Sequence, residues 1–260
     1  MSSETITFPA EDGTPLAGRL DLPADGVEVI GHAIFAHCFT CSKTLHVVKR
    51  VATALNQHGI GVLRFDFTGL GESGGAFADS GFVRNIADLI AAAAFMEREG
   101  RPVGLLVGHS LGGAAVLNAA GELPAVKVVA TIAAPADPAH VQHLFHADGF
   151  NDEGLADVSI GGRPFTISRQ FVEQLEGHHT DERIAALRRP LLVFHSPTDQ
   201  TVGIENAERI FKAAKHPKSF VSLGNADHLI SRAEDAAYIG HVLGTWASFS
   251  LTTAAGGSEA

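Results

Sequence analysis

The sequence predicts an α/β fold with a mostly parallel sheet of about eight strands and helices on both faces. Two observations support this prediction. Short apolar runs alternate along the chain with longer segments in which apolar residues recur at a helical period. The short runs are continuous rather than alternating, which is typical of strands that are covered on both faces. Strand–helix alternation of this kind builds parallel sheets with short connections.

The expected strands and helices follow one another from the N-terminus. Asp12-Gly13 separates two short apolar segments, 6–8 and 16–20, and predicts a hairpin. The later buried strands are expected at 30–36, 61–66, 103–107, 126–132, 191–195 and 219–223. Helices are expected at 43–58, 82–99, 111–121, 205–214 and 233–249. In such sheets the carboxyl ends of the strands form the edge at which ligands bind.

Most of the chain is expected to form one domain, over residues 1–251. Residues 138–189 interrupt the strand–helix alternation and are rich in His and Gly, so they predict a small inserted cap. Residues 252–260 contain Ala, Gly and Ser and predict a flexible tail or linker.

Charge and composition exclude several classes of partner. The chain has 19 basic and 29 acidic residues, for a formal net charge of −10. This balance argues against nucleic acid, which is bound by basic surfaces, and against an electrostatic membrane anchor. No apolar run approaches the roughly 20 residues of a membrane span, and no basic-then-apolar leader is visible, so a cytoplasmic location is expected. Two cysteines are too few for a disulfide framework.

The motif Gly108-His109-Ser110-Leu111-Gly112 carries the strongest chemical signal. It follows a predicted strand and opens a predicted helix, which is the setting of a nucleophile elbow. The turn is tight, so a Cβ atom at either glycine would meet the neighbouring backbone. The bare pattern is weak, and the strand before it and helix after it make it specific. An ordinary helix N-cap is the alternative for Ser110.

A serine hydroxyl needs a base to become a nucleophile. His228 and Asp199 each follow a later predicted strand, in the chain order serine, acid, histidine. We expect Ser110 to be the nucleophile, His228 the general base and then acid, and Asp199 the carboxylate that orients the imidazole. Asp137, which follows another strand, is a rival for the orienting acid.

The oxyanion formed during such a reaction needs two N–H donors. Leu111, directly after the nucleophile, is the expected first donor. Phe39, in the loop after the strand at 30–36, is the expected second donor. Phe39 and His109 are also expected to contact the substrate.

These features together resemble the α/β-hydrolase fold family, from the loop at His37 to His228. The segment from Asp66 to Ser73 resembles the family's Asp-x-x-Gly-x-Gly-x-Ser motif, in which the aspartate is structural. The resemblance implies esterase-type activity and does not name a substrate. The triad chemistry needs no cofactor, and no metal site is expected.

Four further segments are similar to the hydrolase half of bacterial proteins that are fused to a peroxide-handling, OsmC-like domain. They are residues 36–43, 133–140, 199–203 and 216–220. This similarity implies an OsmC-like partner domain.

Cys38 stands where much of the fold family has glycine, so a narrow space for small acyl groups is expected. Cys38 and Cys41 form a C-x-x-C pair, for which two reduced and mostly buried thiols are favoured. The alternative is redox control, in which a disulfide reshapes the loop at Phe39 and lowers activity reversibly. His140, His143 and His146 recur every three residues, but polar histidines of a cap helix are favoured over a metal site.

The function that these residues favour is hydrolysis of small, uncharged, short-acyl carboxylic esters through an acyl-enzyme. The alternatives are an amidase, a peptidase or a thioesterase with the same triad, and a partner-binding module with little turnover. The sequence leaves the oligomeric state open. Dehalogenase and epoxide hydrolase chemistry is disfavoured, because those relatives have an aspartate where this chain has Ser110.

Overall fold

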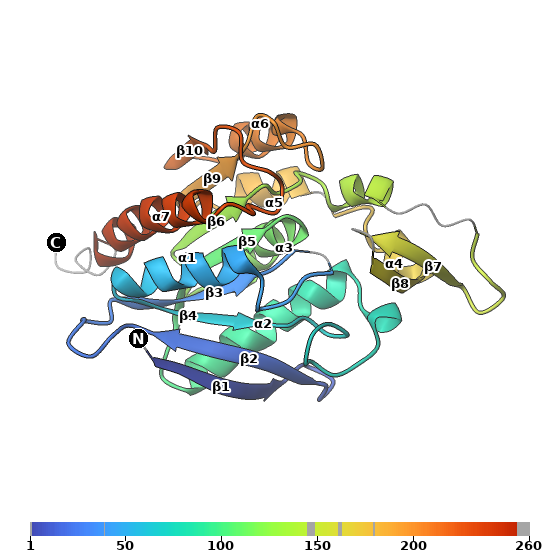
Figure 1. Cartoon of the computed structure of the whole chain (residues 1–260), viewed down its shortest axis with the longest axis horizontal. Helices are drawn as coiled ribbons and strands as arrows, with labels where there is room; N and C mark the ends of the chain where they lie inside the picture. Colours follow the sequence, from blue (N-terminus) through green and yellow to red (C-terminus); the bar gives the residue numbers. More distant parts are fainter. Residues whose placement is uncertain (1, 39, 145–148, 161–162, 179, 254–260) are drawn as a thin grey trace.

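The computed structural model describes residues 2–38, 40–144, 149–160, 163–178 and 180–253 (Figure 1). Its centre is an eight-stranded sheet with the order β1-β2-β4-β3-β5-β6-β9-β10. The first two strands are antiparallel to their neighbours, and all pairs from β4 onward are parallel. The strands are β1 Ser2–Pro9, β2 Pro15–Leu22, β3 Gly31–Ala36, β4 Ile60–Phe65, β5 Val103–His109, β6 Val128–Ile132, β9 Leu191–His195 and β10 Lys218–Ser222. The predicted α/β fold is confirmed.

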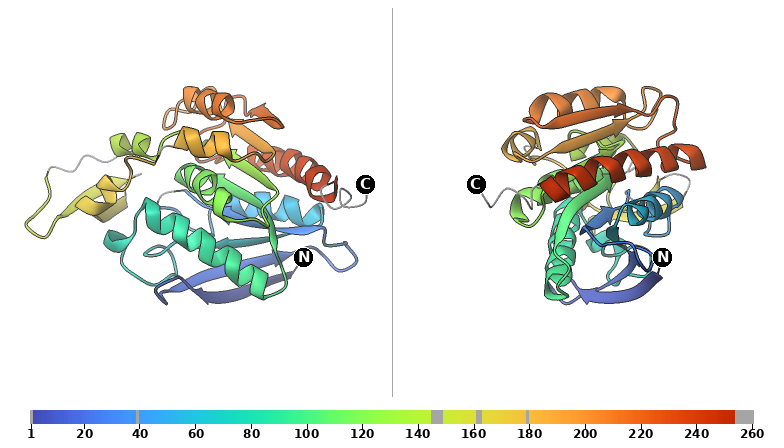
Figure 2. Two further views of the ribbon diagram at one scale, coloured as in Figure 1. Left: turned by 180° about the vertical axis from the view of Figure 1, so that it is seen from behind. Right: turned by 90° about the vertical axis from the view of Figure 1, so that its left-hand side faces the viewer.

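Helices cover both faces of the sheet (Figure 2). On one face lie α1 His46–Gln57 and α7 Ala233–Thr253, and on the other lie α2 Phe82–Arg98, α3 Leu111–Ala119 and α6 Ile204–Ala213. Successive strand residues point to opposite faces, so Ala33 and Phe35 of β3 join one buried cluster while Ile34 and Ala36 join the other. This double burial explains why the central strands are apolar without alternation.

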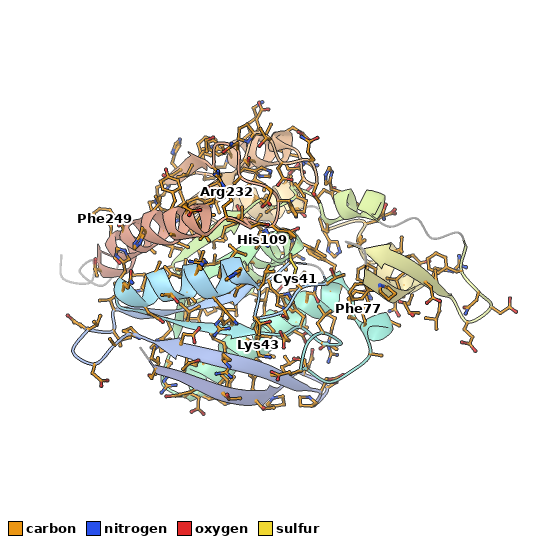
Figure 3. The ribbon with its side chains drawn as sticks, viewed as in Figure 1. Cys41, Lys43, Phe77, His109, Arg232 and Phe249 are labelled. Carbon is orange, nitrogen blue, oxygen red and sulfur yellow. A yellow bond between two sulfur atoms is a disulfide. The ribbon has the colours of Figure 1, made fainter. Side chains whose placement is uncertain are left out.

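The region at 138–189, where a cap was expected, contains short elements. They are η3 Pro138–Leu144, β7 Leu155–Ile160, β8 Arg163–Ser168, α4 Arg169–Glu173 and α5 Thr180–Ala186. Among the described residues, strands β7 and β8 pair only with each other, and they lie beyond the carboxyl ends of the central strands (Figure 1). Phe77, in the turn η1 Phe77–Asp79, faces them and packs its ring 4.8 Å from that of Phe165 (Figure 3). The short turn η2 Ala120–Glu122 follows α3.

The bounds of two helices differ from the expected ones by three residues or more. Helix α7 continues through Thr253, so residues 252–253 are helical rather than part of a tail, and the rest of the predicted tail lies outside the described residues. Helix α1 begins at His46, three residues after the predicted start. The carbonyl oxygen of Lys43, which would accept from the backbone in a helix that started there, accepts instead from Arg64 Nη1 at 2.7 Å. In the described part of the chain, every helix is too short or too polar to cross a bilayer.

Candidate active site

Ser110 lies in the sharp turn between β5 and α3, with a φ angle of 55°. The two flanking glycines make this turn feasible. A Cβ atom at Gly108 would lie 2.3 Å from the carbonyl oxygen of Gly112, and one at Gly112 would lie 2.4 Å from that of His37. No side chain fits at either distance, so the predicted reason for both glycines is confirmed. The turn holds the hydroxyl of Ser110 at the carboxyl end of the central strand.

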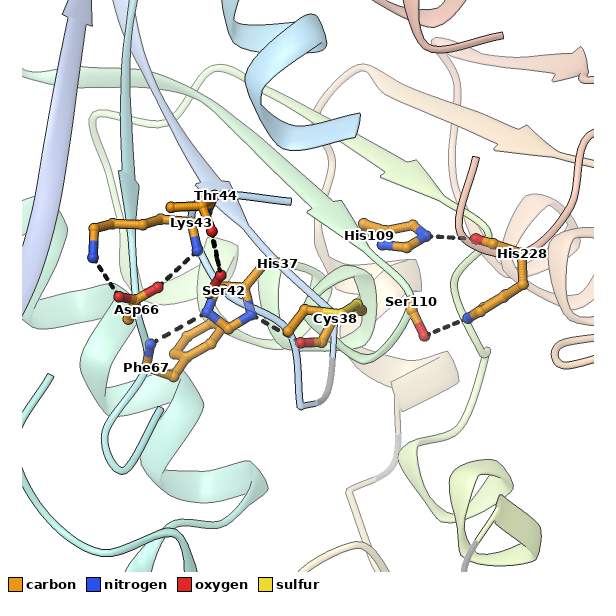
Figure 4. The surroundings of a disulfide bond; sticks show 11 residues. His37, Cys38, Ser42, Lys43, Thr44, Asp66, Phe67, His109, Ser110 and His228 are labelled. Atoms are coloured by element: carbon orange, nitrogen blue, oxygen red, sulfur yellow. Dashed lines mark hydrogen bonds and ion pairs between the residues drawn. A yellow bond between two sulfur atoms is a disulfide. The ribbon is translucent and has the colours of Figure 1, made fainter. Parts of the chain in front are cut away.

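His228 connects Ser110 to Asp199. Its Nε2 lies 2.9 Å from Ser110 Oγ (Figure 4), and its Nδ1 lies 2.8 Å from Asp199 Oδ2. An ionised carboxylate only accepts, so the imidazole donates through Nδ1–H and its Nε2 is left to accept from the serine hydroxyl. The structure therefore brings together three residues that are 89 and 29 positions apart in the chain.

The carboxylate of Asp199 is held by its own turn. The N–H groups of Thr201 and Val202 donate to Oδ1 at 2.8 and 2.9 Å, which leaves Oδ2 for His228. Burial acts to raise the pKa of this carboxyl, but the hydrogen bond and charge of His228 and the two backbone donors outweigh burial and lower the pKa below its ordinary value. Asp199 is therefore ionised at neutral pH.

Asp137, the rival acid, has other partners. Its Oδ1 accepts from the N–H of Ala139 at 3.0 Å, its Oδ2 lies 4.0 Å from Arg209, and its side chain is 44% exposed. These contacts cap a turn at the surface. The carboxylate that contacts the imidazole of His228 is that of Asp199.

His195 is a buried residue of the site that sequence analysis missed. Its Nε2–H donates to the carbonyl oxygen of Val202 at 2.8 Å, and the same nitrogen lies 3.8 Å from Asp199 Oδ2. Burial lowers its pKa, so the ring is neutral and supports the turn that carries Asp199. The available signal was a polar residue at the end of the apolar strand β9, four positions before that aspartate.

His109 does not contact substrate in this arrangement, which corrects the sequence-based assignment. Its side chain is fully buried, and its Nε2–H donates to the backbone carbonyl oxygen of His228 at 2.7 Å (Figure 4). The two imidazole rings lie 5.4 Å apart. His109 therefore holds the loop that carries His228, and it is a positioning residue.

The burial of His109 predicts a pH-dependent stability. Burial, helped by the charge of His228, lowers the pKa of His109 from 6.5 to about 3. Between these values the unfolded chain binds a proton that the folded chain does not, so the free energy of unfolding falls as pH falls. In urea unfolding between pH 4 and 6, we expect His109→Gln, which keeps an N–H donor, to reduce this slope by about 1 kcal/mol per pH unit. An unchanged slope would contradict the assignment.

Of the two predicted oxyanion donors, the structure describes one. Leu111 is the first residue of α3, and N–H groups in the first turn of a helix have no partner within that helix. Phe39, the other predicted donor, lies outside the described residues, so its assignment stays a prediction. Within the described ranges, no group of three or more His, Cys, Asp or Glu side chains is placed to hold a metal ion.

The cysteine pair differs from the favoured expectation. Cys38 and Cys41 are joined in a disulfide, with Cα atoms 5.3 Å apart, rather than being two reduced thiols. The N–H of Cys41 also donates to the carbonyl oxygen of Cys38 at 3.1 Å. Although Cys38 and Cys41 are three positions apart in the chain, the turn between them brings their Cα atoms close enough for a disulfide.

Asp66 has the structural role expected for it. Its buried carboxylate accepts from the N–H groups of Lys43 and Glu72 at 2.7 and 3.0 Å and forms an ion pair with the Lys43 ammonium group. A Cβ atom at Gly71 would lie 2.2 Å from Asp66 Oδ2, so only glycine leaves room for this carboxylate. Asp66 thus ties the loop after β3 to the loop after β4.

Comparison with known proteins agrees with this geometry. A family model described as the alpha/beta hydrolase family matches residues 33–245. The solved esterase domain of a Rhodothermus marinus protein is 52% identical, with a TM-score of 0.82, over 96% of this chain and 100% of that one.

Two more distant proteins are also similar to this chain. Est1E from Butyrivibrio proteoclasticus, solved with ferulic acid bound, is 20% identical, with a TM-score of 0.83, over 95% of this chain and 99% of its own. The uncharacterised protein YfhR of Salmonella typhi is 24% identical over 229 residues, which are 87% of this chain and 75% of that protein. The family match, the sheet order and the elbow lead to one conclusion: this chain belongs to the alpha/beta hydrolase family.

Proposed function

We propose that this protein is a serine carboxylesterase that cleaves small, short-acyl esters. The observation that carries the proposal is the pair of hydrogen bonds through His228, 2.9 Å from its Nε2 to Ser110 Oγ and 2.8 Å from its Nδ1 to Asp199 Oδ2. A serine in a strained elbow, an imidazole in contact with its hydroxyl and an ionised carboxylate together form the arrangement that activates a hydroxyl for acyl transfer.

The reaction follows from this arrangement. Ser110 Oγ attacks the ester carbonyl while His228 Nε2 takes the hydroxyl proton, and Asp199 stabilises the imidazolium. The oxyanion is bound by the N–H of Leu111 and by the second donor, which we assign to Phe39. His228 then gives its proton to the leaving alcohol. Water attacks the acyl-enzyme in the same way and releases the acid.

Similarity to other proteins favours an ester over other acyl substrates. The Rhodothermus marinus structure, at 52% identity, is described as an esterase domain. Amides and thioesters are cleaved by the same triad, so the leaving group has to be decided by experiment. The preference for short acyl groups rests on the sequence, through Cys38 beside the oxyanion loop.

The experiment is a comparison of leaving groups and of chain lengths. Hydrolysis of p-nitrophenyl esters from acetate to palmitate is measured beside an acetyl p-nitroanilide and an acetyl thioester. We expect kcat/KM to be highest for acetate and butyrate and to be much lower for the anilide. Labelling by a fluorophosphonate should fall on the peptide that contains Ser110. Faster cleavage of the anilide or the thioester would overturn the ester proposal.

Two further proposals rest on the sequence alone. An OsmC-like domain is the partner that the similarity of segments 36–43 and 216–220 implies, and the cytoplasm is the expected location. Co-purification of this chain with an OsmC-like protein from the source organism would test the first of them.

A further inference from the structure

The Cys38–Cys41 disulfide lies in the loop after β3, beside the nucleophile elbow (Figure 4). A Cβ atom at Gly112 would lie 2.4 and 2.5 Å from the carbonyl oxygens of His37 and Ala36, so the backbone of the loop touches the first turn of α3. A change in the path of this loop therefore acts directly on the surroundings of the reacting serine.

Both ends of the loop are held by bonds that do not involve the sulfur atoms. The imidazole of His37 donates through Nδ1–H to the carbonyl oxygen of Cys38 at 2.8 Å and accepts at Nε2 from the N–H of Phe67 at 3.4 Å. On the other side, the N–H of Lys43 donates to Asp66 Oδ1 at 2.7 Å. Any change caused by opening the disulfide is thus confined to the few residues between these anchors.

The disulfide closes a ring over residues 38–41, and the backbone of Thr40 within it is strained. Its φ angle is 65°, in the left-handed region that a β-branched residue rarely adopts. Such a conformation persists only where the surroundings enforce it. The disulfide and the hydrogen bond from Cys41 N–H to Cys38 O both close the turn around Thr40. Removing the disulfide takes away one of the constraints that hold Thr40 at a positive φ.

We propose that the Cys38–Cys41 pair is a redox modification site whose co-substrate is a dithiol, and that the disulfide keeps the oxyanion loop competent. Residue 39, to which we assign the second oxyanion donor, lies within the ring in sequence. This inference rests on the proposed function, because that donor serves the tetrahedral intermediate. Reduction releases the strain at Thr40 and lowers turnover.

The exchange is a balanced two-electron reaction. Cys41 is partly exposed, whereas Cys38 is buried, so the incoming thiolate attacks Cys41 Sγ and Cys38 Sγ leaves as a thiolate that takes up a proton. The second thiolate of the dithiol then attacks the other sulfur of the same dithiol, which is bonded to Cys41 Sγ in the mixed disulfide. This step releases Cys41 as a thiolate. The dithiol ends as a disulfide. Glutathione disulfide reverses the reaction by two exchanges and leaves as two molecules of glutathione.

The disulfide is thus proposed to raise turnover, whereas the alternative inferred from the sequence was a disulfide that lowers it. Ser110, His228 and Asp199 are in hydrogen-bond contact while the disulfide is closed. Strain stored at an active site is typical of a preorganised loop. Inside reducing compartments, disulfides are usually transient and redox-sensing, so an accessible C-x-x-C disulfide suits a regulatory role.

The test compares the oxidised and reduced forms of the whole chain. The parent protein is treated with dithiothreitol, freed of reductant and assayed with p-nitrophenyl acetate, and thiols are counted by alkylation and mass measurement. We expect two thiols and a fall in kcat of at least about tenfold, because losing one oxyanion donor costs more than that. Glutathione disulfide should restore the activity. A reduced protein with unchanged or higher kcat would overturn the proposal.

Two variants locate the cause. The double variant Cys38→Ala, Cys41→Ala should have the low kcat of the reduced parent and should not respond to dithiothreitol. Thr40→Gly keeps both thiols but tolerates a positive φ without strain. Its reduced form should therefore lose less activity than the reduced parent does, and a full loss would refute the role of strain at Thr40.

A readout without turnover separates this proposal from the proposed function. Hydrogen–deuterium exchange of the peptide 37–43 should be faster in the reduced parent than in the oxidised one. If the oxidised protein cleaves no ester but this difference is present, the esterase proposal fails while the redox site stands. Equal exchange in both states would overturn the redox proposal, whatever the turnover.

Discussion

Ser110→Ala is expected to lower kcat for ester hydrolysis by about a million-fold relative to the parent. The hydroxyl is the only group in the site that attacks the carbonyl, and the alanine methyl group forms no acyl-enzyme. The remaining rate, from the oxyanion hole and substrate binding, should be about a thousand- to ten-thousand-fold above the uncatalysed reaction. Steady-state assays with p-nitrophenyl acetate measure the effect, and fluorophosphonate labelling should disappear with it.

A matched control is Ser248→Ala. Ser248 is a partly exposed serine of α7 whose hydroxyl donates to the carbonyl oxygen of Gly244 at 2.7 Å, on the helix layer away from the elbow. Its replacement should leave kcat and KM unchanged. Thermal unfolding should show that Ser110→Ala folds as the parent does, because its hydroxyl makes a single bond to a side chain, that of His228. Substantial turnover by folded Ser110→Ala protein would refute the assigned nucleophile.

Asp199→Asn is expected to lower kcat by about ten-thousand-fold. The asparagine Oδ1 can still accept from the N–H groups of Thr201 and Val202, so the turn is kept. Its NH₂ group, however, now faces His228 Nδ1 and requires that nitrogen to accept. The imidazole proton then moves to Nε2, which can no longer accept the proton of Ser110. The variant thus has the right geometry and the wrong tautomer.

Asp137→Asn is the matched control for this substitution. It makes the same chemical change at the other aspartate that the sequence offered as a partner, and Asp137 lies in a surface turn beside Arg209. We expect kcat to stay within about twofold of the parent, since surface changes away from a site have small effects. The contrast is measured at pH 8 with p-nitrophenyl butyrate. A larger loss in Asp137→Asn than in Asp199→Asn would reverse the assignment of the orienting acid.

Much of the fold was predictable because its signals are local. Continuous apolar runs mark strands that are buried on both faces, and β3 shows why: its alternate residues enter two different cores. The hairpin at Asp12-Gly13 was predicted correctly from its turn residues, and strands β1 and β2 pair around it. Helix α1 begins later than its periodicity suggested, because Arg64, from strand β4, binds the carbonyl oxygen of Lys43 that a longer helix would use. A hydrogen bond from a residue that is distant in the chain leaves no signal in the local apolar periodicity.

The elbow and the order of Ser110, Asp199 and His228 were determined by the sequence itself. Gly108 is required by the backbone of Gly112, four positions later, and Gly112 by the backbone of Ala36 and His37 at the end of β3. Chain order and strand ends place the acid and the base at the same edge of the sheet. The elbow can be recognised in the sequence because a tight strand-to-helix turn fixes the spacing of the two glycines around the serine.

Tertiary structure alone decided which partners these groups have. It placed Asp199 rather than Asp137 at His228, directed the buried imidazole of His109 to the backbone carbonyl of His228, and joined Cys38 to Cys41. Each outcome depends on a distance of about 3 Å or less between groups whose direction is set by packing. Residue type and spacing specify which groups are available, but only the folded backbone determines which of them face one another.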